Sequence, residues 1–152
     1  MQAIAIPDEV REVIYAHARA MFPAECCGYL RGDRKAMAVD EVVTCRNAQG
    51  DGVHPLTPER TEETGFVIAG SELLGFAKTF DSSRPARGVY HSHTNGRAYF
   101  SETDRAMAEG PAYPVQHVVI GISPDGITEI AQYVWSGDHR DFIEIGRWAA
   151  TG

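Results

Sequence analysis

The chain has 152 residues, 43% hydrophobic and 23% charged, so it is long enough to bury one core without disulfides or structural metals. Its formal net charge of -7 excludes a surface that follows phosphate backbones, because nucleic-acid binding needs clustered lysine and arginine. Cys26, Cys27 and Cys45 lack the spacing of a disulfide framework or a zinc knuckle, which favours a reducing cytoplasm.

The first ten residues, "MQAIAIPDEV", predict no secretory signal, because no positive residue precedes an apolar run and Pro7 follows early. No apolar run approaches the roughly 20 residues that span a bilayer. We therefore expect a cytoplasmic protein with no membrane or nucleic-acid partner, and one domain over residues 1–152.

The first half of the chain predicts one helix, two strands and a long loop. Apolar residues recur at helical spacing from Val10 to Met21, with acids in the first turn and Pro23 as the stop, which predicts a helix over 8–21. The stretches "ECCGYLRG" and "AMAVDEVVTCRN" predict a hairpin around the turn "GDRK". Residues 48–63 are rich in glycine, proline and charge, which indicates a long loop of the kind that is often functional.

The second half alternates predicted strands and helices. "TGFVIA" predicts a buried strand, and a helix begins near Ser71 and ends before "DSSRPARG". "RGVYHSH" predicts a strand, and residues 101–109 a short helix that stops at Gly110. "VQHVVIGI" and "ITEIAQYVW" form a hairpin around "SPDG", whereas "DFIEIGRW" fits a strand or a helix. Together these elements predict an α/β or α+β domain with a mixed sheet.

Two histidines and an aspartate have the spacing of a metal site. His91 and His93 are two apart in a strand, so both imidazoles point to one side. Ser101 and Asp104 are neighbours in the first turn of the following helix, and Asp104 supplies an oxygen ligand if the loop between folds back. Two histidines and one carboxylate leave the fourth position of a tetrahedral ion open, which is typical of catalytic zinc.

A zinc-activated water also needs a base that delivers a proton to the leaving amine. Glu25, which precedes an apolar strand, is the candidate. Ser101 and Asp104 fit a second interpretation, a helix capping box, which is the commoner use of this pattern when it stands alone. With both histidines and Glu25 present, the metal interpretation is favoured.

The remaining histidines and Cys27 have less specific signals. His17, His117 and His139 are expected to be structural, and so is His54, although its place in the long loop would let it touch a substrate. Cys27 falls on the strand face of Glu25, which predicts either a buried apolar side chain or a modulator beneath the metal.

The chain contains Glu25, then "HSH", then Ser101 after seven residues and Asp104 after two more. This pattern resembles the JAMM motif of the MPN-plus zinc metallopeptidases, E…H-x-H-x7-S-x2-D. The strand and helix of "FVIAGSELL", the approach "GVYHSH" and the strand "VVIGI" follow in the family's order, so the resemblance covers most of the chain. It implies a single JAMM/MPN domain, with a curved mixed sheet flanked by helices similar to that of cytidine deaminases, and is closest to the prokaryotic standalone members.

The resemblance also implies roles for individual residues. His91, His93 and Asp104 would bind Zn²⁺. Glu25 would take the proton of the zinc-bound water and pass it to the amine, and Ser101 would donate to the oxyanion. Thr94 and Phe100 depart from the family, whose members commonly carry proline at these positions.

The implied activity is hydrolysis of the amide bond after the C-terminal Gly-Gly of a ubiquitin-like or sulfur-carrier protein, as a linear or an isopeptide bond. The loops 48–63 and 94–100, with Thr94 and Asn95, are expected to form the groove for that tail. Two alternatives stay open, a non-catalytic MPN-type scaffold module and a zinc hydrolase of another small amide or peptide. The sequence specifies neither the carrier protein nor the oligomeric state.

Overall fold

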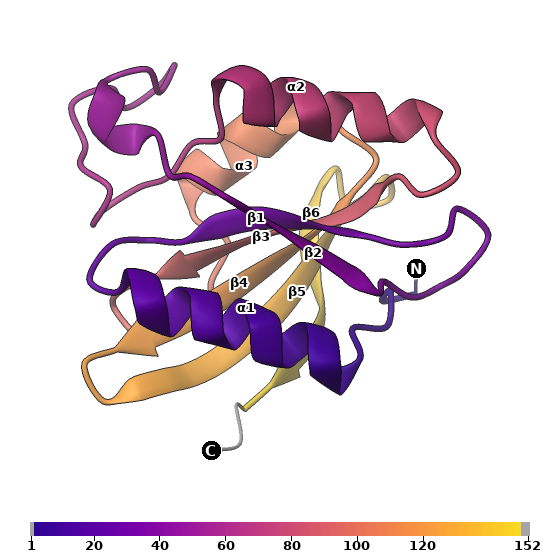
Figure 1. Cartoon of the computed structure of the whole chain (residues 1–152), viewed down its shortest axis with the longest axis horizontal. Coiled ribbons are helices and arrows are strands. Elements are labelled where there is room, and N and C mark those ends of the chain that lie inside the picture. Colours follow the sequence, from indigo (N-terminus) through magenta and orange to yellow (C-terminus); the bar gives the residue numbers. More distant parts are fainter. Residues whose placement is uncertain (1, 150–152) are drawn as a thin grey trace.

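A computed structural model of the chain describes residues 2–149, which form a single α+β domain with a mixed sheet (Figure 1). Within these residues the α-helices are α1 (Asp8–Met21), α2 (Gly70–Lys78) and α3 (Glu102–Glu109), and two 3-10 turns cover Gln49–Asp51 and Thr79–Asp81. The strands are β1 (Cys27–Arg31), β2 (Glu41–Cys45), β3 (Ala86–His93), β4 (Gln116–Ser123), β5 (Gly126–Ser136) and β6 (Asp141–Trp148).

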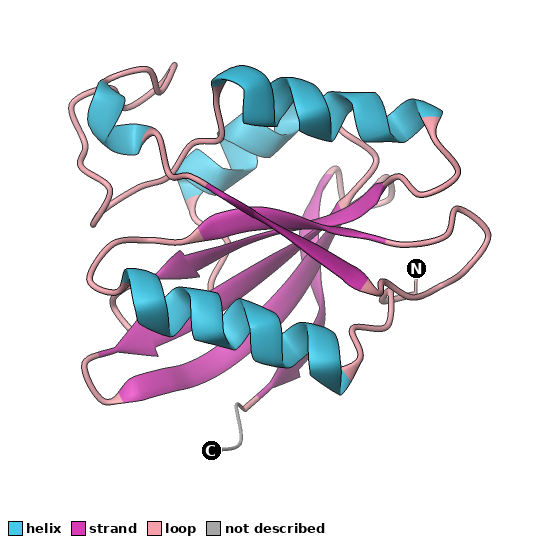
Figure 2. Ribbon diagram, in the orientation of Figure 1, coloured by secondary structure: helices cyan, strands magenta, loops and turns pink. Residues whose placement is uncertain are grey.

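The six strands lie in the order β2-β1-β3-β4-β5-β6, and β3 and β4 form the parallel pair. Helix α1 covers one face of the sheet, and α2 and α3 lie on the other (Figure 2). The core beneath α1 contains Ile14, Ala18, Tyr90, Ile120 and Ile130, all fully buried. Because β1 and β4 flank β3, the strand that carries both histidines is held from two sides.

The predicted helix over residues 8–21 is confirmed with the same bounds. Asp8 and Glu9 in its first turn and Arg19 in its last complement the helix dipole. The helices predicted near Ser71 and over residues 101–109, and the hairpin of β4 and β5, are also confirmed. "DFIEIGRW", for which the sequence left two choices, is the edge strand β6. None of the helices in residues 2–149 has both the length and the apolar composition that crossing a membrane requires.

The first hairpin forms, but its second strand begins later than predicted. Strand β2 starts at Glu41, because residues 36–40 run beside the N-terminal segment instead. Ala5 donates to the Met37 carbonyl at 2.9 Å and accepts from the Val39 amide at 3.1 Å. The link between β1 and β2 is therefore longer than the predicted four-residue turn.

The prediction of a buried strand at "TGFVIA" is wrong. Residues 64–69 belong to no ladder of the sheet, and their backbone bonds instead to residues that follow the end of β2. Val67 makes the main contacts of this segment: its carbonyl accepts from the Ala48 amide at 2.9 Å, and its amide donates to Asn47 Oδ1 at 3.3 Å. The apolar side chains that suggested a strand instead form a wall of the cavity described below.

Candidate metal centre

The end of β3 and the start of α3 bring His91, His93 and Asp104 together. The two histidines alternate with the core residue Ser92 and share the face of the sheet opposite α1. Their Nε2 atoms lie 3.1 Å apart, and each lies 3.2 Å from Asp104 Oδ2. The side chains of His91, His93 and Asp104 are 2%, 9% and 8% exposed, so three ligand-type atoms meet in a buried triangle.

A helix cap holds the carboxylate of Asp104. Ser101 Oγ accepts the Asp104 amide at 3.0 Å, and Asp104 Oδ2 accepts the Ser101 amide at 3.0 Å, which completes a capping box. The two interpretations of this motif therefore coexist, because the oxygen that caps the helix is also the one that faces the histidines. The cap uses the oxygen of the Ser101 hydroxyl and leaves its proton free to donate.

The triangle has the dimensions of a metal site. Ligand atoms at roughly 2.0–2.1 Å from a tetrahedral Zn²⁺ are separated from one another by about 3.3–3.4 Å, close to the three distances found here. Two imidazole nitrogens and one carboxylate oxygen suit Zn²⁺, and they also suit other first-row divalent ions. The three residues are thus a candidate metal site, whose metal the geometry leaves unspecified.

The electrostatics of the three side chains favour the ligand forms. Burial lowers the pKa of His91, so that its imidazole is neutral and offers a lone pair. The pKa of Asp104 lies well below its usual range: burial acts to raise it, but His91 and His93 together lower it more. A neutral imidazole and an ionised carboxylate are the states that bind a cation.

Glu25 lines the same cavity as the triangle. The pairing of β1 with β3 continues beyond Cys27, since Ser92 donates to the Cys26 carbonyl at 3.1 Å, and this places Glu25 beside His93. Glu25 is 6% exposed. Burial first, and the charge of Asp104 second, raise the pKa of its carboxyl to about 9. A cation held by the triangle would lower the pKa of Glu25.

The raised pKa predicts a pH-dependent cost in the metal-free protein. Between about pH 5 and pH 9 folded Glu25 keeps a proton that the unfolded chain releases, so stability falls as pH rises. Metal-free Glu25→Gln should therefore be more stable than the metal-free wild type. The difference in the free energy of unfolding should grow by on the order of several kcal/mol across this range, at about 1.4 kcal/mol per pKa unit. Urea unfolding at pH 5, 7 and 9 measures the margin, and a margin independent of pH contradicts the prediction.

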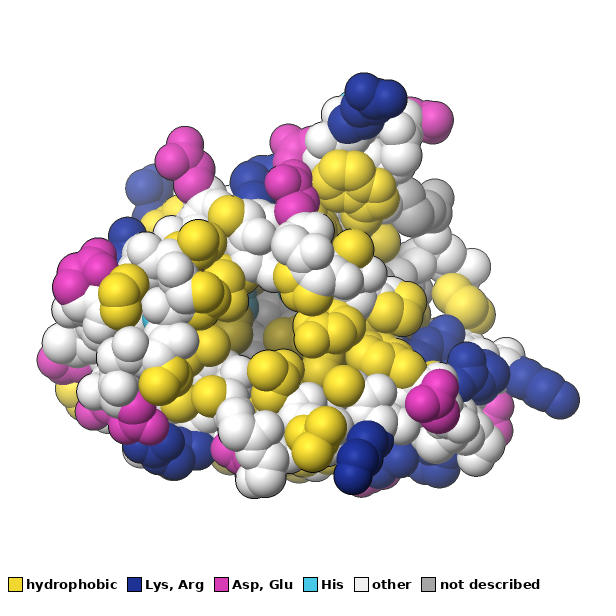
Figure 3. All heavy atoms as spheres, turned by 90° about the horizontal axis from the view of Figure 1, so that it is seen from above, with side chains coloured by type: hydrophobic (Ala, Val, Ile, Leu, Met, Phe, Trp, Pro, Cys, Tyr) yellow, Lys and Arg dark blue, Asp and Glu magenta, His cyan; other side chains and the backbone are white. Residues whose placement is uncertain are grey.

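A cavity of about 780 Å³ connects the triangle to the surface between the segment 53–70 and α3. Figure 3, which looks onto the side of the molecule that carries α2, shows a hollow bordered by apolar side chains. Four large hydrophobic lining residues are also exposed to solvent, Val53, Leu56, Leu73 and Tyr99. The polar triangle therefore lies in an apolar groove large enough for a polypeptide segment.

The structure brings most of the other predicted site residues to this cavity. Thr94, Asn95 and His54 line it, and Thr94 Oγ1 donates to the Glu63 carbonyl at 3.0 Å, which joins the two loops predicted to form the groove. His54 Nδ1 accepts the amides of Leu56 and Thr57, both at 3.0 Å, so its second nitrogen carries the proton.

Cys27 and two of the other histidines lie outside the cavity lining. Cys27 is fully buried in the cluster beneath α2, and burial is the main cause that raises the pKa of its thiol. His17 pairs with the Tyr90 hydroxyl at 2.7 Å and His139 with the Ser136 hydroxyl at 2.9 Å, as expected of structural residues.

Sequence reasoning missed four residues around the site. Phe66 stacks on His91 with ring centroids 4.2 Å apart, and Tyr99 packs against His93 at 4.7 Å. His117, expected to be only structural, lines the cavity, and burial lowers its pKa to about 4. Buried Asn47 donates to the carbonyls of Glu25 at 2.9 Å and Gly65 at 3.0 Å. No spacing marks these residues, since Phe66, His117 and Asn47 approach the site from distant segments, and Tyr99 reaches His93 only through the path of the 94–100 loop.

A family model described as prokaryotic homologs of the JAB domain matches residues 7–135. The chain belongs to this family. The order of sheet and helices described above is its JAB/MPN fold, as the JAMM resemblance predicted.

Named relatives of this JAB-domain chain are peptidases. It is 31% identical over 150 residues to a desampylase of Haloferax volcanii, in an alignment that covers 93% of each chain. It is 28% identical over 108 residues to the CysO-cysteine peptidase of Mycobacterium tuberculosis, covering 71% of this chain and 67% of the relative.

Two solved structures share the fold of this JAB domain. A solution structure from Desulfitobacterium hafniense superimposes with a TM-score of 0.63 at 23% identity, covering 91% of this chain and 87% of the other. One from Salinibacter ruber gives 0.62 at 20% identity, covering 96% and 89%. At these identities the likeness shows the fold alone.

Proposed function

We propose that this chain is a zinc-dependent peptidase or isopeptidase that hydrolyses the amide bond after the C-terminal Gly-Gly of a ubiquitin-like or sulfur-carrier protein. The observation that carries the proposal is the meeting of His91, His93 and Asp104 in one buried cavity that Glu25 also lines. The JAB family membership and the peptidase relatives support the reaction class.

In this proposal His91 Nε2, His93 Nε2 and Asp104 Oδ2 hold the metal. Bound Zn²⁺ supplies an acidified water at neutral pH and polarises the scissile carbonyl. The ionised form of Asp104 and the neutral form of His91 suit this task. The capping box fixes the carboxylate before any cation binds, because Ser101 holds the oxygen that faces the histidines.

Glu25 acts as general base and then as general acid. Its carboxylate takes a proton from the attacking water and delivers it to the leaving amine. The raised pKa suits the second half of the task, because a carboxyl that holds its proton near neutral pH can still give it to an amine. Ser101 donates its free hydroxyl proton to the oxyanion of the tetrahedral intermediate.

An extended tail fits the cavity beside residues 64–69. Residues 65–69 belong to no helix, turn or strand, and in this proposal they follow an extended path. The amide and carbonyl of Val67 are already bonded to residues 47 and 48. Backbone groups of neighbouring residues in an extended chain point to opposite sides, so Phe66 and Ile68 direct theirs away from residues 47 and 48. A glycine-ended tail can pair with this edge, because it has no side chains to exclude it from a narrow approach.

The decisive experiment uses a small ubiquitin-like carrier that ends in Gly-Gly and is extended by one amino acid. Zinc-loaded protein should release that residue. The same carrier ending in Ala-Ala serves as the matched control and should be cut far more slowly. A chelator should abolish cleavage, and added Zn²⁺ should restore it.

Each alternative function has its own outcome in this experiment. A protein that holds no divalent metal and cuts neither carrier supports a scaffold module. A metal-loaded protein that cuts unrelated short amides as fast as the Gly-Gly carrier supports a zinc hydrolase of another substrate class. Elemental analysis of the purified protein identifies the metal.

A further inference from the structure

Seven residues, 94–100, connect His93 at the end of β3 to Ser101, the cap of α3. Their path determines where Asp104 meets the two histidines. This loop contains no helix or strand, and Gly96 has a φ of 78°, in the left-handed region. A loop without regular structure keeps one conformation only if its backbone groups find other partners.

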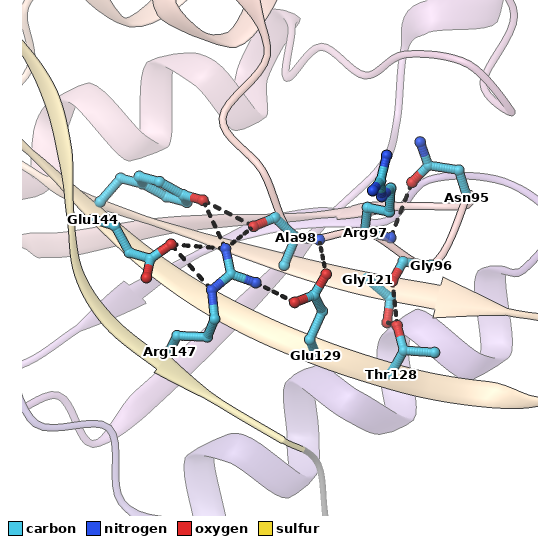
Figure 4. Close-up of polar contacts among 10 residues, drawn as sticks. Asn95, Gly96, Arg97, Ala98, Gly121, Thr128, Glu129, Glu144 and Arg147 are labelled. Atoms are coloured by element: carbon cyan, nitrogen blue, oxygen red, sulfur yellow. Dashed lines mark hydrogen bonds and ion pairs between the residues drawn. The ribbon is translucent and has the colours of Figure 1, made fainter.

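Side chains of β5 and β6 bind both backbone groups of Ala98, in the middle of this loop (Figure 4). Glu129 Oε1 accepts the Ala98 amide at 3.1 Å. The Ala98 carbonyl accepts from Arg147 Nη2 at 2.9 Å and from the Tyr133 hydroxyl at 2.8 Å. Ala98 is 1% exposed, so these bonds replace water that cannot reach it.

Two acids hold the guanidinium of Arg147 in place. It forms an ion pair with Glu129, and its Nη2 and Nε atoms donate to Glu144 Oε1 at 2.7 and 3.1 Å. A guanidinium is a planar fork of donors, so binding on two sides fixes the direction of the bond to Ala98.

Both backbone groups of Gly96 are also bonded to the sheet. Its amide donates to the Ile122 carbonyl at 3.0 Å, and its carbonyl accepts from the Thr128 hydroxyl (Figure 4). A Cβ atom on Gly121 would lie 2.6 Å from the Gly96 carbonyl oxygen. The loop therefore packs directly on the backbone of β4, beside His93.

Irregular pairing brings these side chains together. Glu144 and Arg147 are three residues apart, which in a regular strand places them on opposite faces. A register shift pairs Tyr133 with Glu144 and Ala131 with Arg147, so both side chains lie on one face. Thr128 lies at a second shift, between β4 and β5. Both irregularities serve contacts to the 94–100 loop.

We propose that Thr128, Glu129 and Arg147 are positioning residues of the candidate metal centre, an inference that rests on the proposed function. With Tyr133 and Glu144 they form what we name the β5–β6 anchor. The anchor fixes the loop at Gly96 and Ala98, and so keeps Asp104 at the distance from the histidines that a divalent cation requires.

The test compares Arg147→Met with Arg84→Met. Arg84 is an equally exposed arginine, 38% in both cases, that pairs with Asp40 and Glu41 in and beside β2, at the opposite edge of the sheet. Arg147→Met should raise the Kd for Zn²⁺ by about 10- to 100-fold, the usual effect of losing a residue that supports a ligand, and Arg84→Met should leave it unchanged. Competition with a chromophoric chelator measures the Kd.

A second variant and a second measurement separate positioning from general stability. Thr128→Val keeps the shape of the side chain and removes the hydroxyl that holds Gly96, so it should also weaken Zn²⁺ binding. In metal-free protein, exchange of the Ala98 amide should accelerate about tenfold in Arg147→Met and stay unchanged in Arg84→Met. This measurement reports how firmly the 94–100 loop is held, whether or not metal binds.

Each outcome of these measurements supports or overturns the proposal. Wild-type Zn²⁺ affinity in both Arg147→Met and Thr128→Val overturns the proposal, and so does an equal loss in Arg84→Met. Unchanged Ala98 exchange in Arg147→Met overturns the anchor itself. A wild-type protein that binds no divalent cation contradicts the proposed function, and amide exchange then decides separately whether the anchor holds the loop.

Discussion

Glu25→Gln should lower the turnover of a Gly-Gly-extended carrier by about 10²- to 10⁴-fold while leaving the metal content unchanged. Glutamine has nearly the same shape, but an amide neither takes a proton from water nor delivers one to an amine. Glu25 is not part of the triangle of His91, His93 and Asp104, so its loss removes no ligand. Single-turnover cleavage and metal analysis on the same preparation measure both quantities.

Glu63→Gln is the matched control for this variant. Glu63 lines the same cavity, but it is exposed and its carbonyl, not its carboxylate, accepts from Thr94. It should keep turnover within a few-fold of wild type. If Glu25→Gln retains turnover as Glu63→Gln does, Glu25 is not the base and the proton transfer belongs to another group of the cavity.

The sequence predicted the parts of the site that depend on local geometry. Alternation along a strand places His91 and His93 on one side, and the first turn of a helix places Ser101 beside Asp104. Both relations involve neighbouring residues, so they follow from the period of each element. The meeting of these two pairs required the JAMM resemblance, because it depends on the path of the loop between them.

The sequence did not predict features that depend on distant partners. The apolar run at residues 64–69 has the composition of a strand, but its backbone bonds to Asn47 and Ala48, beyond the end of β2, and to no strand of the sheet. Likewise Glu144 and Arg147 reach one face through a register shift beside Gly146, and a single glycine in a strand does not specify where the pairing shifts. Pairing between segments distant in the sequence decides such cases, and local propensity does not predict that pairing.

Asp104→Ala should abolish both metal binding and turnover, and it should also destabilise the metal-free protein. Two roles meet in this carboxylate, since Oδ2 faces both histidines and accepts the Ser101 amide. Loss of the capping contact alone costs about 0.5–2 kcal/mol. Metal content, turnover and the free energy of unfolding after chelation measure the three effects.

Asp104→Asn separates the two roles, because an amide oxygen still accepts the Ser101 amide but carries no charge to balance a cation. The metal-free variant should keep most of the helix cap, and it should bind Zn²⁺ far more weakly than wild type. Glu102→Gln removes a charge from the same first turn at an exposed position, so it controls for the helix dipole and should change neither property by much. Normal zinc content in Asp104→Asn would remove this carboxylate from the ligand set and leave the cap as its only function.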